Sequence, residues 1–118
     1  MPTEELPIVL RTVEEALIFI QSGNARIQLT SAASGNSYRY WIRESSKGKS
    51  FFVSVITISG TLAYLGTISD ATLGRTAKSR VSEAAPVYRA FAWMWSQLAA
   101  NLRSNQIPAG LTITGLSR

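Results

Sequence analysis

The sequence predicts an α+β protein in which a four-stranded antiparallel meander packs against one long C-terminal helix, with a short N-terminal helix and a C-terminal edge strand. Four segments rich in β-branched and aromatic residues follow one another, separated by short turn-forming stretches. A helical period follows Pro86, and a second lies near the N-terminus. The length of 118 residues, with 46% hydrophobic and 16% charged residues, fits a single globular domain over residues 1–118.

The N-terminal helix is expected over about residues 12–22. Thr12 and Glu15 have the spacing of a capping box, in which a hydroxyl and a carboxylate each satisfy a free backbone amide. Apolar residues then recur at helical spacing, and Gly23 supplies a left-handed stop. This helix is expected to cover one face of the sheet, while residues 1–11 form an extended or flexible segment.

The four strands of the meander follow. In the first, Ile27 and Leu29 alternate with polar residues, as in a strand with one buried face. The second alternates as well, with Tyr38, Tyr40 and Ile42 on the face assigned to the core. The third is almost continuously apolar, which is typical of a strand buried on both faces. The expected strands span residues 25–30, 38–44, 51–58 and 62–68.

After the fourth strand we expect a long loop and then the long helix. The apolar pattern stops over residues 69–82, where basic and hydroxyl side chains dominate. Pro86 suits the first turn of a helix, which Pro108 would end, and residues 111–114 alternate like an edge strand. The apolar stripe expected to dock this helix on the sheet comprises Val87, Phe91, Met94, Trp95, Leu98 and Leu102.

The composition excludes several classes of function. The chain has no cysteine and no histidine, so it lacks disulfides, thiolate chemistry, the commonest zinc ligands and the usual general base near neutral pH. Only seven acidic residues are present. We therefore expect a protein that is not an enzyme and has no cofactor or metal site. No apolar run approaches the roughly 18 to 20 residues that span a bilayer, so we expect no membrane association and a cytoplasmic location.

The charge is distributed unevenly along the chain. Residues 1–20 hold one basic and four acidic residues, a net charge of −3, whereas the rest holds eleven basic and three acidic residues, a net charge of +8. A basic body with an acidic head predicts an anionic partner, either nucleic acid or an acidic protein surface. A basic surface that serves only solubility is the alternative.

The central strand supplies the strongest candidate site. Its second face carries Arg39, Trp41 and Arg43, a flat indole between two guanidinium groups. Such a face offers phosphate contacts and a platform on which bases can stack, and Arg26 on the neighbouring strand would widen it. The alternative is that a helix covers Trp41 while the arginines extend past it to solvent. Alternation within the strand cannot distinguish the two.

Other basic residues fall in turns and loops. Lys47 and Lys49 occupy a predicted hairpin tip, where they would contact phosphates without reading sequence or would only aid solubility. Arg75, Lys78 and Arg80 mix with hydroxyl residues, the usual set for backbone contacts, or form a solvated loop.

Trp93 lies opposite the apolar stripe of the long helix. It indicates either a homodimer seam along that helix or a wide buried face covered by a terminal element.

Several motifs occur together over about residues 26–102. They are Ser34–Tyr40, Phe51–Val55, Tyr64–Ile68, Thr76–Arg80, Ala85–Pro86 and Phe91–Trp95. In this order they resemble a family of small phage and plasmid proteins of unknown function. The resemblance implies a mobile-element origin and a shared fold. Members of that family typically continue into a cysteine-rich, zinc-knuckle-like tail, which has no counterpart in this sequence, so no property of the tail is carried over. The expected layout is also similar to that of single-strand-binding transcriptional cofactors.

The leading hypothesis is a non-enzymatic accessory protein of a phage or mobile element that binds single-stranded or distorted nucleic acid. If it is phage-encoded, it would act in the host cytosol. An alternative is a phage-encoded, anti-CRISPR-like inhibitor that occludes a host defence complex by docking on an acidic protein or ribonucleoprotein surface. A third hypothesis is a sponge for a nucleotide signal, with arginine and aromatic residues lining a pocket.

Overall fold

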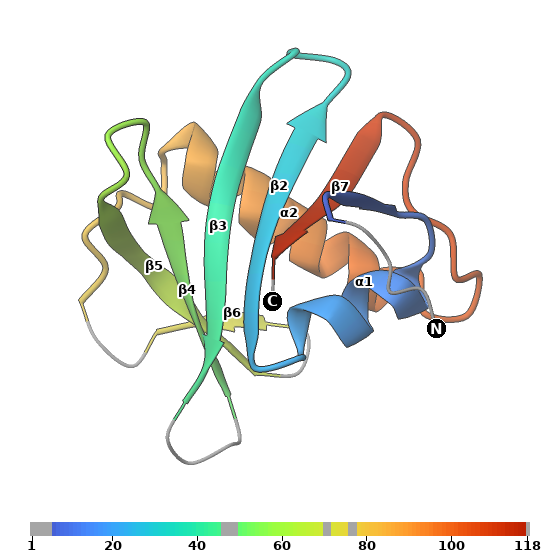
Figure 1. Cartoon of the computed structure of the whole chain (residues 1–118), viewed down its shortest axis with the longest axis horizontal. Helices are drawn as coiled ribbons and strands as arrows, with labels where there is room; N and C mark the ends of the chain where they lie inside the picture. The colour runs from blue at the N-terminus through green and yellow to red at the C-terminus, as the bar shows by residue number, and fades with distance from the viewer. Residues whose placement is uncertain (1–5, 46–49, 70–71, 76–77, 118) are drawn as a thin grey trace.

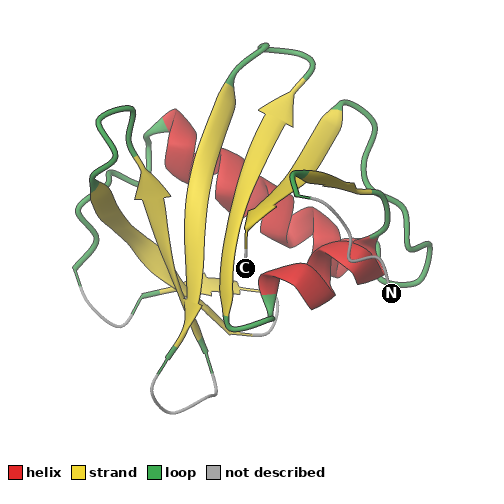
Figure 2. Cartoon of the chain, in the orientation of Figure 1, coloured by secondary structure: helices red, strands yellow, loops and turns green. Residues whose placement is uncertain are grey.

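A computed structural model describes residues 6–45, 50–69, 72–75 and 78–117. Within these residues the chain forms a mostly β structure with two helices. The strands are β1 (Ile8–Leu10), β2 (Asn24–Ser31), β3 (Ser37–Glu44), β4 (Phe51–Ile56), β5 (Leu62–Ser69), β6 (Thr72–Gly74) and β7 (Leu111–Ser117), and the helices are α1 (Val13–Ile20) and α2 (Pro86–Ala100). Figures 1 and 2 show α2 passing behind the sheet, with β2 and β3 in front of it.

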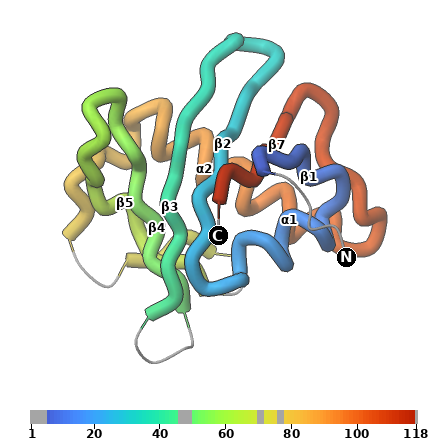
Figure 3. The backbone as a smooth tube through the Cα atoms, viewed as in Figure 1, coloured from blue at the N-terminus to red at the C-terminus, as the bar shows by residue number. Residues whose placement is uncertain are grey.

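The described strands form one seven-stranded antiparallel sheet in the order β1-β7-β2-β3-β4-β5-β6. The prediction of a four-stranded meander on one long C-terminal helix is therefore wrong. The four expected strands are present as β2 to β5, but β1, β6 and β7 extend the sheet on both sides. β7 was expected at an edge over residues 111–114; it is longer and lies between β1 and β2, as the trace in Figure 3 shows.

Both helices cover the same face of the sheet. The Tyr40 hydroxyl on β3 donates to the Val87 carbonyl of α2 at 2.7 Å, and its ring lies 4.9 Å from that of Phe91. On α1, the Phe19 ring lies against Gly115 of β7, where a Cβ atom would sit only 2.6 Å from it. Large side chains fully buried in this core include Tyr40, Ile27, Ile42, Leu65, Ile68, Phe91, Met94, Leu98 and Ile113.

The start of α1 follows the predicted capping pattern with one change. The Thr12 hydroxyl accepts a hydrogen bond from the Glu15 amide at 3.1 Å, whereas the Glu15 carboxylate reaches the amide of Arg11 at 2.9 Å rather than that of the cap residue. The side chain of Asn105 accepts from the Glu14 amide at 2.7 Å. A residue from the far end of the chain thus completes the cap, which no local motif could indicate.

Two predicted boundaries are wrong. α2 begins at Pro86 as expected but ends at Ala100, well before Pro108, because turns already start at Asn101; Leu102 is 59% exposed and does not extend the apolar stripe. β4 ends at Ile56 instead of residue 58.

At the end of β4, Ile58 is fully exposed at a turn. That turn is held by the Thr57 hydroxyl, which lies 3.0 Å from that of Ser59 and 2.6 Å from that of Thr61. These local hydroxyl bonds oppose strand extension despite the apolar sequence.

The segment 69–82, expected to be a loop, contains β6. This three-residue strand pairs with the end of β5 through Ile68 and Leu73. It was missed because so short an element carries no detectable alternation.

Candidate nucleic-acid interface

The face of the sheet opposite the helices carries the candidate site. Trp41 lies between Tyr40 and Ile42, both buried on the helix-covered side, so alternation places the indole on the other side. We call the side chains of β2 to β5 that point this way the open face. Its central members are Arg26, Gln28, Arg39, Trp41, Arg43, Phe52, Ser54 and Tyr64. The structure thus brings together the four residues predicted from the central strand and its neighbour.

Strand register gathers these residues around Trp41. Arg26 on β2 is its direct cross-strand partner, and Arg43 lies two residues further along β3. The guanidinium carbons of Arg26 and Arg43 lie 4.5 Å and 4.3 Å from the indole centroid. The indole Nε1 donates to the side-chain oxygen of Asn24, which orients the ring. Both described helices lie on the other face of the sheet, so neither covers Trp41. The side chain is half-buried because the surrounding side chains shield part of its surface.

The arginines of the open face have no carboxylate partner within the described chain. The described residues contain one ion pair, between Arg75 and Glu83. Arg39 donates from Nε to the side-chain oxygen of Gln28 at 3.1 Å, a neutral acceptor. Arg26 donates from Nη1 to the Ser117 hydroxyl at 3.4 Å, also neutral. Among the described residues no carboxylate thus pairs with the arginines of the open face, and cation–π attraction holds two of these arginines against the one indole.

An aromatic pair extends the open face beyond Trp41. Phe52 on β4 pairs with Arg43, and its ring contacts that of Tyr64 on β5 edge-on at a centroid distance of 6.4 Å. The Tyr64 hydroxyl lies 2.6 Å from that of Thr67. Indole, phenyl and phenol rings thus occupy three adjacent strands, which gives a surface on which planar groups can stack.

Sequence reasoning missed several residues of this face. Asn24 and Gln28 position Trp41 and Arg39, and alternation along β2 would have placed both beside Arg26. Phe52 was hidden because it belongs to the continuously apolar β4, where alternation is absent. Tyr64 was missed because β5 bends at an irregular pairing next to Val53, so its alternation changes there.

The predicted basic loop is only partly joined to the open face. Arg75 pairs with Glu83, which offsets its charge. The Arg80 amide donates to the Tyr64 carbonyl at 3.2 Å, so this residue is anchored at the edge of β5. Lys78 is exposed. Of the three predicted basic residues, Arg80 is thus the one that bonds to Tyr64, and the neighbouring Ser79 hydroxyl donates to the same carbonyl at 3.0 Å.

Lys47 and Lys49 lie outside the described residues. The chain on either side of them is closed by the Ser45 amide, which donates to the Ser50 carbonyl at 2.9 Å. This closure lies at the end of β3 that carries Arg43.

Trp93 does not belong to the open face. It projects from α2, in the layer on the other side of the sheet, and its side chain is 46% exposed. The interpretation that a terminal element buries Trp93 is therefore wrong.

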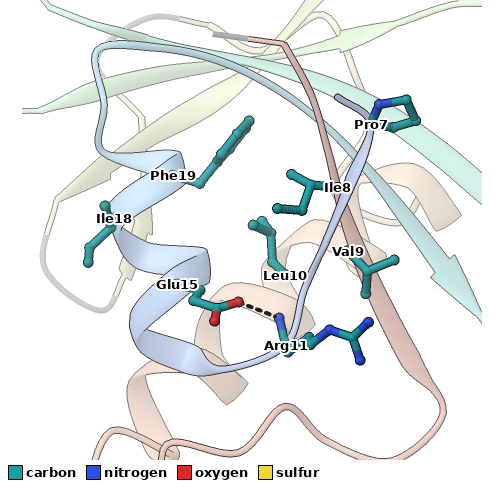
Figure 4. A pocket seen from close by; sticks show the side chains of 8 residues that line it. All are labelled: Pro7, Ile8, Val9, Leu10, Arg11, Glu15, Ile18 and Phe19. Atoms are coloured by element: carbon teal, nitrogen blue, oxygen red, sulfur yellow. Dashed lines mark hydrogen bonds between the residues drawn. The ribbon is translucent and has the colours of Figure 1, made fainter. Parts of the chain in front are cut away.

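A separate groove of about 570 Å³ lies between β1 and α1, as Figure 4 shows. Exposed Val9 and Ile18 contribute to its lining, and the Glu15 carboxylate bonds to the Arg11 amide at its rim. Its charged lining residues are one basic and one acidic side chain, Arg11 and Glu15, so the groove offers a polyanion no net positive charge. We therefore place the candidate interface on the open face.

The described part of the chain has no helix long and apolar enough to cross a membrane. It also contains no group of three or more acidic side chains that could hold a metal ion. Comparisons with protein-family models, with curated proteins and with solved structures give no match to this chain.

Proposed function

We propose that this protein is a non-enzymatic module that binds single-stranded nucleic acid through its open face. The observation that carries the proposal is the pair of guanidinium groups, Arg26 and Arg43, held against one indole without an ion pair to any carboxylate of the described chain. Two guanidinium groups beside one ring repel each other, and an anion that contacted both would relieve this repulsion. A phosphate group placed between them would accept charge-assisted hydrogen bonds from both.

The layout of the open face favours a single strand over a duplex. The major groove of DNA admits a protruding helix or a β-ribbon, whereas here both helices lie on the far side of the sheet. A broad face with three rings can instead contact unstacked bases, while Arg39 and the arginine pair follow the phosphates. Every base has a flat face, so such contacts tolerate any sequence.

The cellular setting forms part of the proposal. The resemblance of several motifs to small phage and plasmid proteins supports an accessory protein of a mobile element acting in the cytosol, where single strands arise during replication and repair. Aromatic stacking and phosphate contacts need no catalytic group, cofactor or metal.

The second candidate is an anti-CRISPR-like inhibitor that docks the same face on an acidic protein or ribonucleoprotein surface. Arginines without an ion pair beside half-buried aromatic rings are also the residue types that anchor protein interfaces. The preferred partner distinguishes the two candidates. An inhibitor would bind a purified host complex more tightly than any oligonucleotide of the same charge.

The test measures binding of fluorescently labelled oligo-dT and oligo-U by anisotropy as a function of salt. Three arginine–phosphate contacts predict a slope of log K against log salt of about −2 on single strands. The double variant Arg26→Gln/Arg43→Gln should lose about 1.4 of this slope. The matched control, Arg11→Gln/Arg103→Gln, removes the same charge from exposed positions elsewhere and should keep the slope.

Three outcomes would contradict the proposal. The first is binding that does not change with salt. The second is an affinity for oligonucleotides no better than for heparin, and the third is an equal loss of affinity in the control variant.

A further inference from the structure

A cleft of about 520 Å³ opens between α2 and the helix-covered face of the sheet. We call it the helix cleft. It lies at one end of the β2–β3 pair, and its walls come from the first turns of α2, from the ends of β2 and β7, and from the β2–β3 connection. Its lining includes the polar residues Ser31, Asn36 and Arg89 and the aromatic residues Tyr38 and Trp93. Small-molecule sites typically have volumes of roughly 300 to 1,000 Å³ and combine an apolar lining with a few polar groups.

Polar side chains without partners converge on the helix cleft. Within the described chain, the Ser31 hydroxyl, the side-chain amide of Asn36, the Tyr38 hydroxyl and the Arg89 guanidinium make no hydrogen bond or ion pair to another residue. Four groups that can donate hydrogen bonds are thus available at one place. Their neighbour Thr30 is different, because its hydroxyl lies 2.9 Å from that of Ser37.

Two aromatic side chains of the helix cleft are likewise free. Ring contacts in the described chain pair Tyr40 with Phe91 and Phe52 with Tyr64, so neither Tyr38 nor Trp93 is engaged by another ring. Trp93 is 46% exposed on a helix whose Trp95 is only 3% exposed. An indole left open beside a free phenol offers stacking surface to a flat ligand.

The charge of the helix cleft selects among flat ligands. Among the described residues that line it, Arg89 is the only ionisable group besides the Tyr38 phenol, and none is acidic. The lining therefore favours a ligand with a single anionic group attached to a planar, hydrogen-bonding ring.

We propose that the helix cleft is a binding site for a free nucleoside monophosphate. The base would stack against Trp93, Arg89 would bind the phosphate, and the Asn36 and Tyr38 side chains would contact the base or the sugar. This function goes beyond the strand binding proposed for the open face and does not depend on it, because the two sites lie on opposite sides of the sheet.

Titration of the intact protein with AMP, GMP, CMP and UMP tests the proposal, with binding followed by calorimetry and by quenching of tryptophan fluorescence. The unphosphorylated nucleosides and inorganic phosphate serve as reference ligands. At least one monophosphate should bind saturably and at least about tenfold more tightly than its nucleoside, since the guanidinium contact is charge-assisted.

Variants at the two sites locate the ligand. Trp93→Ala and Arg89→Gln should each weaken monophosphate binding at least about tenfold, and Trp93→Phe should restore most of it. Arg103→Gln, a matched loss of charge beyond α2, should leave it unchanged. Trp41→Ala should also leave it unchanged while weakening oligonucleotide binding, so failure at either site can be recognised separately.

Specific results would overturn the proposal. They are the absence of saturable binding at millimolar monophosphate, equal binding by the Trp93→Ala variant, and loss of monophosphate binding in Trp41→Ala instead. A fourth is a homodimer that Trp93→Ala dissociates, observed by sedimentation without any nucleotide binding, because Trp93 would then serve self-association. Circular dichroism of each variant confirms that the fold is retained.

Discussion

Replacing Trp41 with alanine should affect binding more than folding. The ring makes two cation–π contacts, each worth roughly 0.5–1 kcal/mol at a solvent-accessible site, and one hydrogen bond to Asn24 worth roughly 0.5–1.5 kcal/mol. We therefore expect the free energy of unfolding to fall by about 2 kcal/mol. Truncation of a fully buried tryptophan would cost roughly 3–5 kcal/mol.

The effect of Trp41→Ala on binding has two sources. Loss of a stacking surface costs roughly 1–3 kcal/mol per base, which is a weakening of at least about fivefold in single-strand affinity. The arginine pair also loses the ring that holds its two guanidinium groups in place, so phosphate binding requires more ordering. Urea denaturation measures the change in the free energy of unfolding. Anisotropy with labelled oligo-dT at fixed salt measures the change in single-strand affinity.

A control variant makes the result decisive. Trp41→Phe keeps an aromatic face but loses the indole N–H, and it should retain most of the affinity. The reasoning would be refuted if Trp41→Ala bound oligo-dT within twofold of the wild type. A loss of stability above roughly 4 kcal/mol would also refute it, because the ring would then act as core.

Three further changes test the packing and capping of the fold. Gly115→Ala should destabilise the protein by roughly 1–3 kcal/mol in urea, because a Cβ there would sit 2.6 Å from the Phe19 ring; Phe19→Leu in the same chain should recover part of the loss. Burial raises the pKa of the Tyr40 phenol, so its contribution to stability is complete below the ordinary pKa of about 10 and is lost as the pH rises above it. Thermal unfolding at increasing alkaline pH should show this loss, and Tyr40→Phe should diminish it while removing the hydrogen bond from the Tyr40 hydroxyl to the Val87 carbonyl. Thr12→Ala should cost roughly 0.5–2 kcal/mol through the lost helix cap, and a wild-type melting temperature would contradict this assignment.

Local patterns located many elements, because period and capping depend on neighbouring residues. Alternation along β3 correctly separated the buried Tyr40 and Ile42 from Trp41 on the opposite face. The architecture was missed because it depends on pairing between the ends of the chain, where Ile8 lies opposite Gly115. An alternating pattern such as that of β7 occurs in interior strands and in edge strands alike. The local sequence therefore could not indicate that β7 lies between β1 and β2.

The candidate site was predictable in its residue types but not in its environment. The sequence placed Arg39, Trp41 and Arg43 on one face, yet which face the helices cover depends on contacts such as that between Tyr40 and Val87. Whether the arginines pair with carboxylates depends on residues brought together only by folding. The helix cleft could not be predicted from the sequence. Tyr38 lies on the sheet and Trp93 on α2, and only the packing of these two layers brings them to one cleft.

The central position of β7 has a consequence for how the protein is made. A ribosome releases β1 early, but the strand with which β1 pairs is translated only after all the other elements. β2 to β5 can associate as neighbouring hairpins during synthesis, whereas β1 must wait, and one edge of β2 stays open to other chains meanwhile. Closure of so large a loop should slow the last step of folding, so aggregation during expression should respond strongly to changes within Leu111–Ser117.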